Sequence, residues 1–255
     1  SMLRGSIQAS LPGLPPFELF PHVQPVGTSR SADALILLNN RPPSFLPHLW
    51  HQAGVRVCAD GGLNRLFDDR TFRRSCSPDA VVGDLDSAHT EAIAHFQRRG
   101  CEIVHVPDQN RGDLDKCIDY VIERCRDVVS PVILVTNGAS GRLDSLVANL
   151  HVLFSRCPSR IVFYTQESVG IALPTGTSTL NILDRVLLPL GCGLLPLNGP
   201  AEVTTSGFKW DLADDTLSLD RLVSSSNEIS LGSATVTVTT SAPLLLSLTL
   251  QADSD

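Results

Sequence analysis

Two aspartates stand at the end of a short apolar run, in the segment Ala80-Val-Val-Gly-Asp84-Leu-Asp86-Ser87. Both carboxylates can turn toward one point if the chain leaves a β-sheet there, because they are only two residues apart. Two carboxylates so close repel each other, and a cation relieves that cost. Mg²⁺ prefers hard oxygen ligands and is usually held by one or two carboxylates together with substrate phosphates. The pair Asp84 and Asp86 therefore predicts a magnesium site, with an acidic surface turn as the alternative.

A second polar turn, Cys58-Ala-Asp60-Gly61-Gly62, joins an apolar run to a helical pattern. Its glycines allow a ligand to approach the backbone, and the N-terminus of the following helix favours anions. We therefore expect Asp60 to face a nucleotide or its metal ion. The alternative is that Asp60 only caps the helix.

Two further turns carry the positive charges that a polyphosphate needs. Lys116 lies one helical turn after Asp113, on the same side of the best-patterned helix in the chain, where it could meet a phosphate. For Asp113 itself, a helix cap is the alternative. In the segment Asn137-Gly-Ala-Ser-Gly-Arg142-Leu-Asp144, a turn bounded by glycines precedes an arginine that suits a polyphosphate, and Asp144 would orient Arg142 or contact the ligand.

Short apolar runs alternate with helical patterns between residues 34 and 165. Each helical pattern has one apolar stripe. Such a pattern indicates an α/β fold, with a mostly parallel sheet covered by helices on both faces. Ligands of these sheets bind beyond the carboxyl ends of the strands, so the four acidic turns are expected at one rim. The expected strands are 34–39, 55–59, 80–82, 102–106, 132–136 and 161–164, and the expected helices are 88–99, 114–125 and 143–154.

The pattern changes after about Ser168, where Thr, Ser, Gly and Val dominate and helical periodicity disappears. Residues 234–240 alternate with a period of two, as a half-buried antiparallel strand does. We predict three segments: a flexible N-terminal extension over 1–30, an α/β domain over 31–167 and an all-β sandwich or barrel domain over 168–255.

The composition narrows the class of protein. A formal net charge of -7 argues against general nucleic-acid binding, which requires a basic surface. Seven cysteines without CxxC spacing fit reduced thiols, and so a cytoplasmic protein, better than a disulfide framework or a zinc site. We expect no membrane span, because no run approaches the ~18 apolar residues that one requires.

The polar turns, taken in order, resemble the motifs of the thiamine pyrophosphokinase family. The resemblance spans about residues 35 to 250 and therefore both predicted domains. The segments that carry it are Asp60-Gly-Gly with Asn64-Arg65, Gly83-Asp84-Leu-Asp86-Ser87, Pro107-Asp-Gln109 with Asp113 and Lys116, Gly141-Arg142-Leu-Asp144, Thr204-Thr-Ser-Gly207-Phe-Lys209-Trp210, and Leu222-Val-Ser224-Ser-Ser-Asn227.

The resemblance implies a transferase that moves the diphosphoryl group of ATP to the hydroxyl of thiamine, giving thiamine diphosphate and AMP. It also implies an N-terminal domain that holds Mg²⁺ and ATP, a C-terminal domain that contributes to the thiamine pocket, and a homodimer with an active site shared across the interface. The implied metal ligands are Asp60, Asp84, Asp86 and Asp113. The implied ATP-binding residues are Asp60, Gly61, Asn64, Arg65, Gln109, Asp113, Lys116, Gly138 and Arg142. The implied thiamine-binding residues are Trp210, Ser224 and Asn227, and the implied catalytic residues are Asp84, Asp86, Asp113, Lys116 and Asp144.

An indole suits the cationic thiazolium of thiamine, because its π-face attracts a desolvated cation; an ordinary packed aromatic is the alternative for Trp210. Two positions depart from the family pattern: Gly112 replaces a threonine before Asp113, and Asn137 replaces the first of two paired glycines. Either departure could alter ATP affinity or nucleotide preference, but neither removes a charged group.

Two other functions remain open at this point. Asp84-x-Asp86 resembles the nucleophile motif of haloacid-dehalogenase-like phosphatases, although the β-rich half has no place in that scheme. A catalytically silent binder of thiamine or nucleotide is the third possibility. The products would discriminate them: AMP for the kinase, inorganic phosphate for the hydrolase, and neither for the binder.

Overall fold

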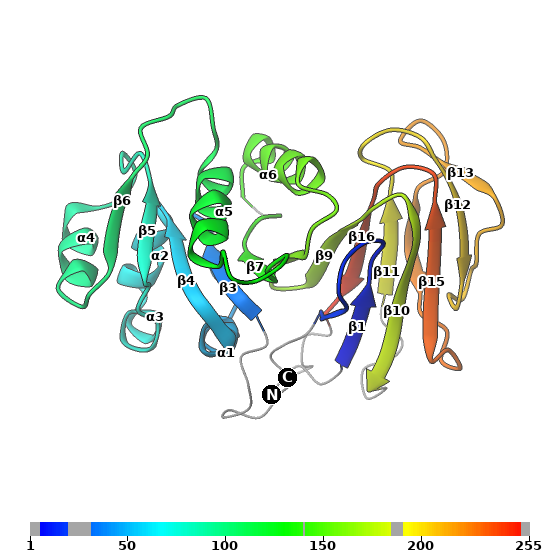
Figure 1. Ribbon diagram of the computed structural model, residues 1–255, viewed down its shortest axis with the longest axis horizontal. Helices are drawn as coiled ribbons and strands as arrows, with labels where there is room; N and C mark the ends of the chain where they lie inside the picture. Colours follow the sequence, from blue (N-terminus) through cyan, green and yellow to red (C-terminus); the bar gives the residue numbers. More distant parts are fainter. Residues whose placement is uncertain (1–5, 20–31, 140, 185–190, 251–255) are drawn as a thin grey trace. The chain divides into compact units, whose positions relative to one another are not determined.

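The computed structural model describes residues 6–19, 32–139, 141–184 and 191–250, which Figure 1 draws in colour. The chain divides into two compact units. We call residues 26–152 with 163–166 the α/β unit, and residues 1–25, 153–162 and 167–255 the β unit.

A parallel sheet forms the centre of the α/β unit, in the strand order β7-β3-β4-β5-β6. β5 and β7 are buried along their whole length, as expected for strands covered on both faces. The predicted strands are therefore confirmed, to within two residues at each end. The bounds are β3 Ala32–Leu37, β4 Ala53–Ala59, β5 Ala80–Gly83, β6 Glu102–His105 and β7 Ile133–Thr136, followed by β8 at Ile161–Tyr164.

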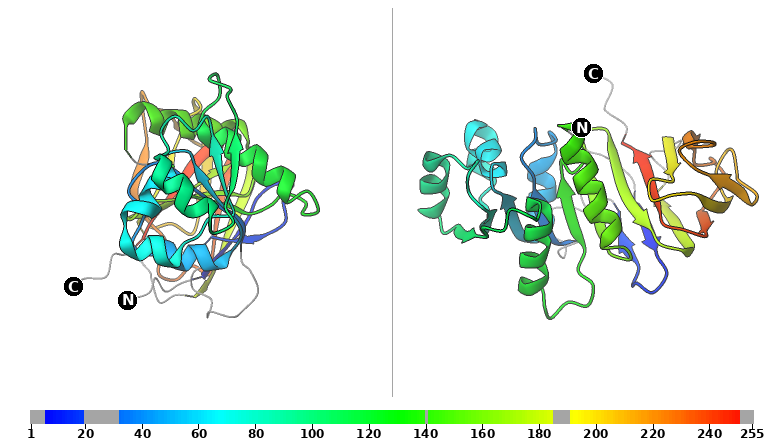
Figure 2. Two further views of the ribbon diagram at one scale, coloured as in Figure 1. Left: turned by 90° about the vertical axis from the view of Figure 1, so that its left-hand side faces the viewer. Right: turned by 90° about the horizontal axis from the view of Figure 1, so that it is seen from above.

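Helices cover both faces of this sheet, with α5 on one face and α1 and α2 on the other (Figure 2). α5 buries the apolar stripe that the sequence predicted, including Leu114, Cys117, Ile118 and Val121. The bounds are α1 Leu46–Gln52, α2 Gly62–Asp68, α3 Arg70–Ser75, α4 Thr90–Gln97, α5 Asp113–Arg124 and α6 Leu143–Ser155.

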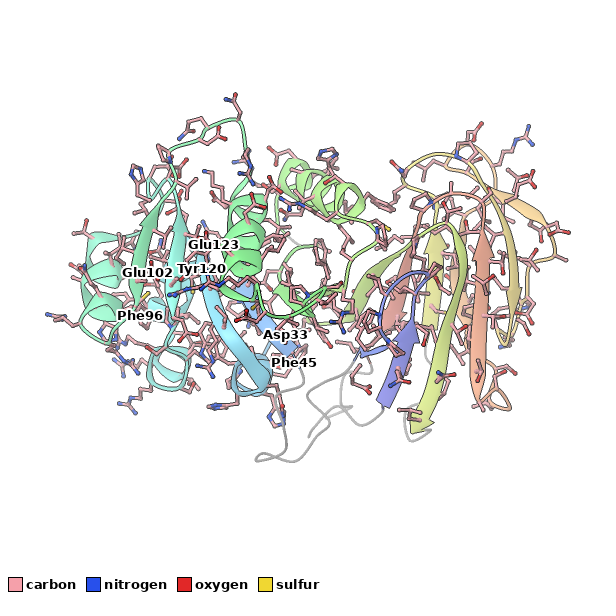
Figure 3. All side chains as sticks on the ribbon, in the orientation of Figure 1. Asp33, Phe45, Phe96, Glu102, Tyr120 and Glu123 are labelled. Carbon is pink, nitrogen blue, oxygen red and sulfur yellow. The ribbon has the colours of Figure 1, made fainter. Side chains whose placement is uncertain are left out.

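α5 is also tied to the edge strand β6 by polar side chains. The hydroxyl of Tyr120 donates to a carboxylate oxygen of Glu102 (2.8 Å), and Arg124 donates to the same oxygen (2.7 Å). Figure 3 shows Tyr120 and Glu102 close together. These contacts fix the helix whose N-terminal end carries Asp113.

α6 does not bury its whole apolar stripe, as a helix that covers a sheet was expected to do. Its apolar stripe exists, but Leu143 is 76% exposed and Val147 is 56% exposed, and burial begins only at Val152 and Leu153. The first two turns of α6 therefore present an apolar surface in this chain.

The β unit consists of antiparallel strands, which confirms the prediction of a β-rich C-terminal half. One set follows the order β13-β12-β15-β10-β1-β2, and the other follows β14-β11-β16-β9. The predicted alternation appears in β15, where Val236 and Val238 are buried. The bounds are β9 Ser168–Leu173, β10 Gly176–Asp184, β11 Gly191–Leu195, β12 Ala201–Ser206, β13 Asp215–Leu217, β14 Ser224–Glu228, β15 Thr235–Thr240 and β16 Leu244–Thr249.

The expectation of a flexible N-terminal extension is wrong for residues 6–18. β1 (Ser6–Ser10) pairs antiparallel with β10, and β2 (Phe17–Glu18) pairs with β1. Ile7 and Ala9 are buried at a spacing of two residues, so this segment contributes to the core of the β unit. Residues 1–5 and 20–31 lie outside the described part of the chain. Among the described residues, no helix is long and apolar enough to cross a membrane.

Candidate active site

Three aspartates meet at the carboxyl end of the parallel sheet. Asp60 follows β4, Asp84 and Asp86 follow β5, and one carboxylate oxygen of each lies within 4.8 Å of the others. The backbone is unusual at two points here: φ is 36° at Asp60 and 64° at Leu85. Residues other than glycine adopt such angles at a cost, and they concentrate at functional sites.

Gly83 makes this approach possible. A Cβ at this position would lie 2.8 Å from the Cβ of Asp60 and 3.5 Å from a carboxylate oxygen of Asp113. Real Cβ atoms do not approach so closely, so only glycine lets β5 pass beside Asp60.

Asp60 is the most deeply buried member of this group, with 2% of its surface exposed. One carboxylate oxygen accepts from the backbone N–H of Ser87 (3.2 Å), while Oδ1 has no hydrogen-bond partner among the described residues. Burial, and secondarily the charge of Asp113, raises the pKa of Asp60 to about 6, although the Ser87 N–H partly opposes the shift. The cap position of α2 is Gly61 and has no side-chain cap, so the interpretation of Asp60 as a helix cap is wrong.

Lys116 supplies a buried positive charge beside the three aspartates. It is 3% exposed, and its Nζ lies 3.4 Å from Asp113 Oδ1 and 3.7 Å from Asp84 Oδ2. Asp113 is the first residue of α5 and Gly112 is its N-cap, so the capping alternative is wrong for Asp113 as well. Asp113 lies outside the group of three carboxylates and pairs with Lys116 instead.

The pKa values of the two carboxylates beside Lys116 are shifted in opposite directions. Burial raises the pKa of Asp113 more than the charge of Lys116 lowers it. At Asp84 burial also acts to raise the pKa, but Lys116 and a hydrogen bond from Gln109 (2.6 Å) outweigh it, so the pKa is lowered. Of these two carboxylates, Asp84 is therefore the one whose charged form is better supported. The predicted contact of Gln109 with ATP stays a prediction.

Asn64 supports the loop after β5. Its Nδ2 donates to Ser87 C=O (2.8 Å), and its Oδ1 accepts from the N–H of His89 (2.8 Å). Asn64 is 7% exposed, and these bonds satisfy the polar atoms of its buried amide. The neighbouring Arg65 is exposed and donates to Asn39 (3.0 Å). The predicted contacts of Asn64 and Arg65 with ATP stay predictions.

Arg142 and Asp144 form a forked ion pair, with both side chains largely exposed. The hydrogen bond from Arg142 lowers the pKa of Asp144. Both residues line an open groove of about 1110 Å³, together with Gly112 and residues of α6. The structure therefore brings Arg142 and Asp144 together as the sequence predicted, on a surface that a ligand can reach.

The β unit places the three residues predicted to bind thiamine on neighbouring loops and strands. Trp210 is 53% exposed, and Ser224 begins β14. Asn227 is buried and directed at the backbone of Trp210: its Oδ1 accepts from the Trp210 N–H (3.3 Å), and its Nδ2 donates to the Trp210 C=O (2.8 Å). The structure thus makes Asn227 a support of Trp210, and its contact with thiamine stays a prediction.

Two residues of this region were not among the predicted site residues. Asp211 fastens the turn before Trp210 by accepting from the N–H groups of Gly207 (3.2 Å) and Phe208 (3.0 Å), a local pattern typical of aspartate in turns. Lys209 lies against the ring of Trp210, with Nζ 4.5 Å from the ring centroid. The sequence indicated this contact only through the adjacency of Lys209 and Trp210.

A parallel α/β sheet with an acidic rim, a buried lysine and an arginine-bearing groove is typical of enzymes that act on phosphate compounds, and this chain adds a β unit to it. Comparison with known families agrees with this class. The model of the thiamin pyrophosphokinase catalytic domain matches residues 46–164, and that of the thiamin pyrophosphokinase vitamin B1 binding domain matches residues 187–245.

Curated relatives extend the match over most of the chain. Thiamine pyrophosphokinase 3 of Oryza sativa subsp. japonica is 35% identical over 87% of this chain and 88% of its own length. Thiamine pyrophosphokinase 2 of Arabidopsis thaliana is 33% identical, with 86% of each chain covered. The chain belongs to the thiamine pyrophosphokinase family, and so to the ATP-dependent diphosphotransferases.

Solved structures confirm the fold. Yeast thiamin pyrophosphokinase superposes with a TM-score of 0.78 at 21% identity, covering 89% of both chains. The enzyme of Candida albicans gives 0.77 at 24% identity, covering 86% of this chain and 89% of its own. The comparisons support neither the phosphatase alternative nor the silent binder.

Proposed function

We propose that this chain transfers the diphosphoryl group of ATP to the hydroxyl of thiamine, giving thiamine diphosphate and AMP. One observation carries the proposal: a chain that matches both family models has a group of three carboxylates beside a buried lysine at the expected rim. Thiamine as the acceptor follows from the names of the matched domains and relatives.

Mg²⁺ is the proposed cofactor, and the residues present fit it. Asp60, Asp84 and Asp86 offer hard oxygen donors, and the unpartnered Oδ1 of Asp60 is a buried acceptor that a cation would satisfy. Burial also raises the pKa of Asp60, because a buried carboxylate is costly to charge, and a bound cation would offset that cost. When bound, Mg²⁺ would supply positive charge against the phosphates. Asp113 lies outside this group of three and would support the site through its ion pair with Lys116.

The protein's own residues would position ATP and neutralise charge. The thiamine hydroxyl oxygen attacks the β-phosphorus, the bond from that phosphorus to the oxygen bridging it to the α-phosphate breaks, and AMP leaves with that oxygen. Such transfer depends on positioning and charge neutralisation. Lys116 and Arg142 would face the phosphates, with Gln109 as a polar neighbour. The remaining ATP contacts are proposed at Gly61, Asn64, Arg65 and Gly138.

A carboxylate would accept the proton of the thiamine hydroxyl. Asp144 is the weaker candidate base, because its ion pair with Arg142 lowers its pKa. The pKa of Asp113 is raised, and that carboxylate lies beside Lys116. We therefore propose that Asp113 accepts the proton of the thiamine hydroxyl and that Asp144 orients Arg142.

A homodimer with a shared active site is also proposed. The exposed apolar face at Leu143 and Val147 supports it, because exposed large apolar side chains that cluster on one helix mark interaction surfaces. Trp210, Ser224 and Asn227 would form the thiamine site, with Asn227 also holding the backbone of Trp210. A cytoplasmic location is proposed because all seven cysteines are free thiols.

The test is a product assay. The protein is incubated with ATP, Mg²⁺ and thiamine, and AMP and thiamine diphosphate are measured together. Asp86→Asn, which removes an exposed member of the carboxylate group, is expected to lower turnover sharply without unfolding the protein. Release of inorganic phosphate instead of AMP would support the hydrolase, and binding of both substrates without AMP would support the silent binder.

A further inference from the structure

A lysine already occupies the ring face of the exposed tryptophan. The ammonium of Lys209 lies 4.5 Å from the centroid of the Trp210 ring, within the ~6 Å range of a cation–π contact. About half of the surface of Trp210 is exposed, so the indole is available to a ligand.

Neighbouring groups hold both partners of this contact in place. The ammonium of Lys209 pairs with a carboxylate oxygen of Glu228 (3.1 Å), and the backbone N–H of Lys209 donates to Glu228 C=O (2.8 Å). Asn227 holds the backbone of Trp210 through two hydrogen bonds. The geometry is therefore built by β14 and the turn after β12, and does not depend on a bound ligand.

We propose that Lys209 acts as an internal cation that competes with the thiazolium ring of the substrate for this face of Trp210. The inference rests on the proposed function, because it takes thiamine as the ligand of Trp210. Two cations repel each other on one ring face, so the thiazolium must displace the ammonium before it can stack. Glu228 lowers the cost of that displacement, since Lys209 keeps its ion pair when it leaves the ring.

This arrangement makes Lys209 a determinant of the affinity for thiamine. The cationic thiazolium is repelled by the ammonium and must displace it, whereas a neutral ring is not repelled in this way. Lys209 would thus reduce the affinity for thiamine more than the affinity for a neutral ring.

The experiment is calorimetric titration of thiamine into the wild-type protein and into Lys209→Met, which keeps an unbranched side chain and removes the charge. Loss of the competing contact is expected to tighten thiamine binding about two- to fivefold. Lys209→Arg, which retains a cation, should bind thiamine like the wild type. The neutral ring half of thiamine, 4-methyl-5-(2-hydroxyethyl)thiazole, should gain no comparable advantage from Lys209→Met.

A double-mutant cycle separates this mechanism from a general charge effect. In a Trp210→Leu background, Lys209→Met should no longer tighten thiamine binding, because the shared ring is absent. A gain of equal size in that background, unchanged or weaker binding by Lys209→Met alone, or no thiamine binding by any variant would overturn the inference. Failure of the wild type to release AMP would count against the proposed function, whereas the calorimetric comparison of thiamine affinities still decides the role of Lys209.

Discussion

The buried carboxylate of Asp60, whose Oδ1 has no hydrogen-bond partner among the described residues, should make the metal-free protein less stable than it would be without that charge. We expect Asp60→Asn to raise the free energy of unfolding when no divalent cation is present. Asparagine keeps an oxygen that accepts from the Ser87 N–H, its amide can donate to the neighbouring carboxylates, and it tolerates the φ of 36° at this position. The substitution therefore removes charge with little change of shape.

The magnitude follows from the pKa of Asp60, which is raised from 3.8 to about 6. At about 1.4 kcal/mol for each pH unit, the difference corresponds to about 3 kcal/mol. The folded-state pKa lies above the unfolded value, so the folded protein binds the proton more tightly and stability falls as pH rises through this range. The destabilisation is about 1 kcal/mol at pH 4.5 and is complete, at about 3 kcal/mol, above pH 7.

Urea unfolding of both proteins in a chelator, at pH 4.5 and pH 8, measures this difference. Asp60→Asn should be the more stable protein at pH 8, and its advantage should shrink at pH 4.5. With Mg²⁺ and ATP added, the wild type should gain stability and the variant should gain much less. Asp68→Asn makes the same chemical change at an exposed position of α2 and should show neither effect. A variant that is less stable than the wild type in chelator at pH 8 would refute the account of Asp60.

Four further outcomes test other parts of the site and fold. Asp84→Asn should lower the rate of AMP formation by at least about 100-fold while circular dichroism stays unchanged, and near-normal turnover would contradict the metal-site proposal. Gly83→Ala should destabilise the protein by about 1–3 kcal/mol in urea, because the new Cβ would lie 2.8 Å from that of Asp60; an unchanged midpoint would show that the strand can shift. Gly112→Thr should stabilise α5 by about 0.5–1 kcal/mol, because the threonine hydroxyl can cap the helix. A Cβ at this position meets nothing within 4 Å among the described residues. A lower thermal midpoint of the variant would contradict this prediction. Val147→Glu should convert the proposed dimer to a monomer in sedimentation analysis, and an unchanged mass would exclude this face of α6 as the interface.

The sequence predicts the acidic rim well, because the rule that places it is topological. In a parallel sheet the carboxyl ends of the strands share one edge, so residues after β4 and β5 meet whatever their distance along the chain. α5 was equally predictable from the sequence, since a long helix with one apolar stripe has an unambiguous period. α1 and α3, with seven and six residues, are too short for that signal.

The N-terminal strand was missed for a related reason. Ile7 and Ala9 provide only a brief alternation inside a segment rich in proline and glycine, and β1 exists because it pairs with β10, far along the chain. A short strand of this kind has little local propensity, and non-local pairing decides its structure. Its neighbours in the sequence therefore gave no reliable indication of it.

The departures of this chain from the family pattern differ in their physical effect. Asn137 has a φ of 69°, a conformation that asparagine tolerates better than most residues, and its Nδ2 donates to Asn40 C=O (2.9 Å). Replacement of a glycine by Asn137 is therefore compatible with the same turn before Arg142. Gly112 is different, because it lines the groove that contains Arg142 and leaves space where a threonine side chain would stand. Of the two departures, Gly112 is thus the one expected to change how the α/β unit contacts its nucleotide.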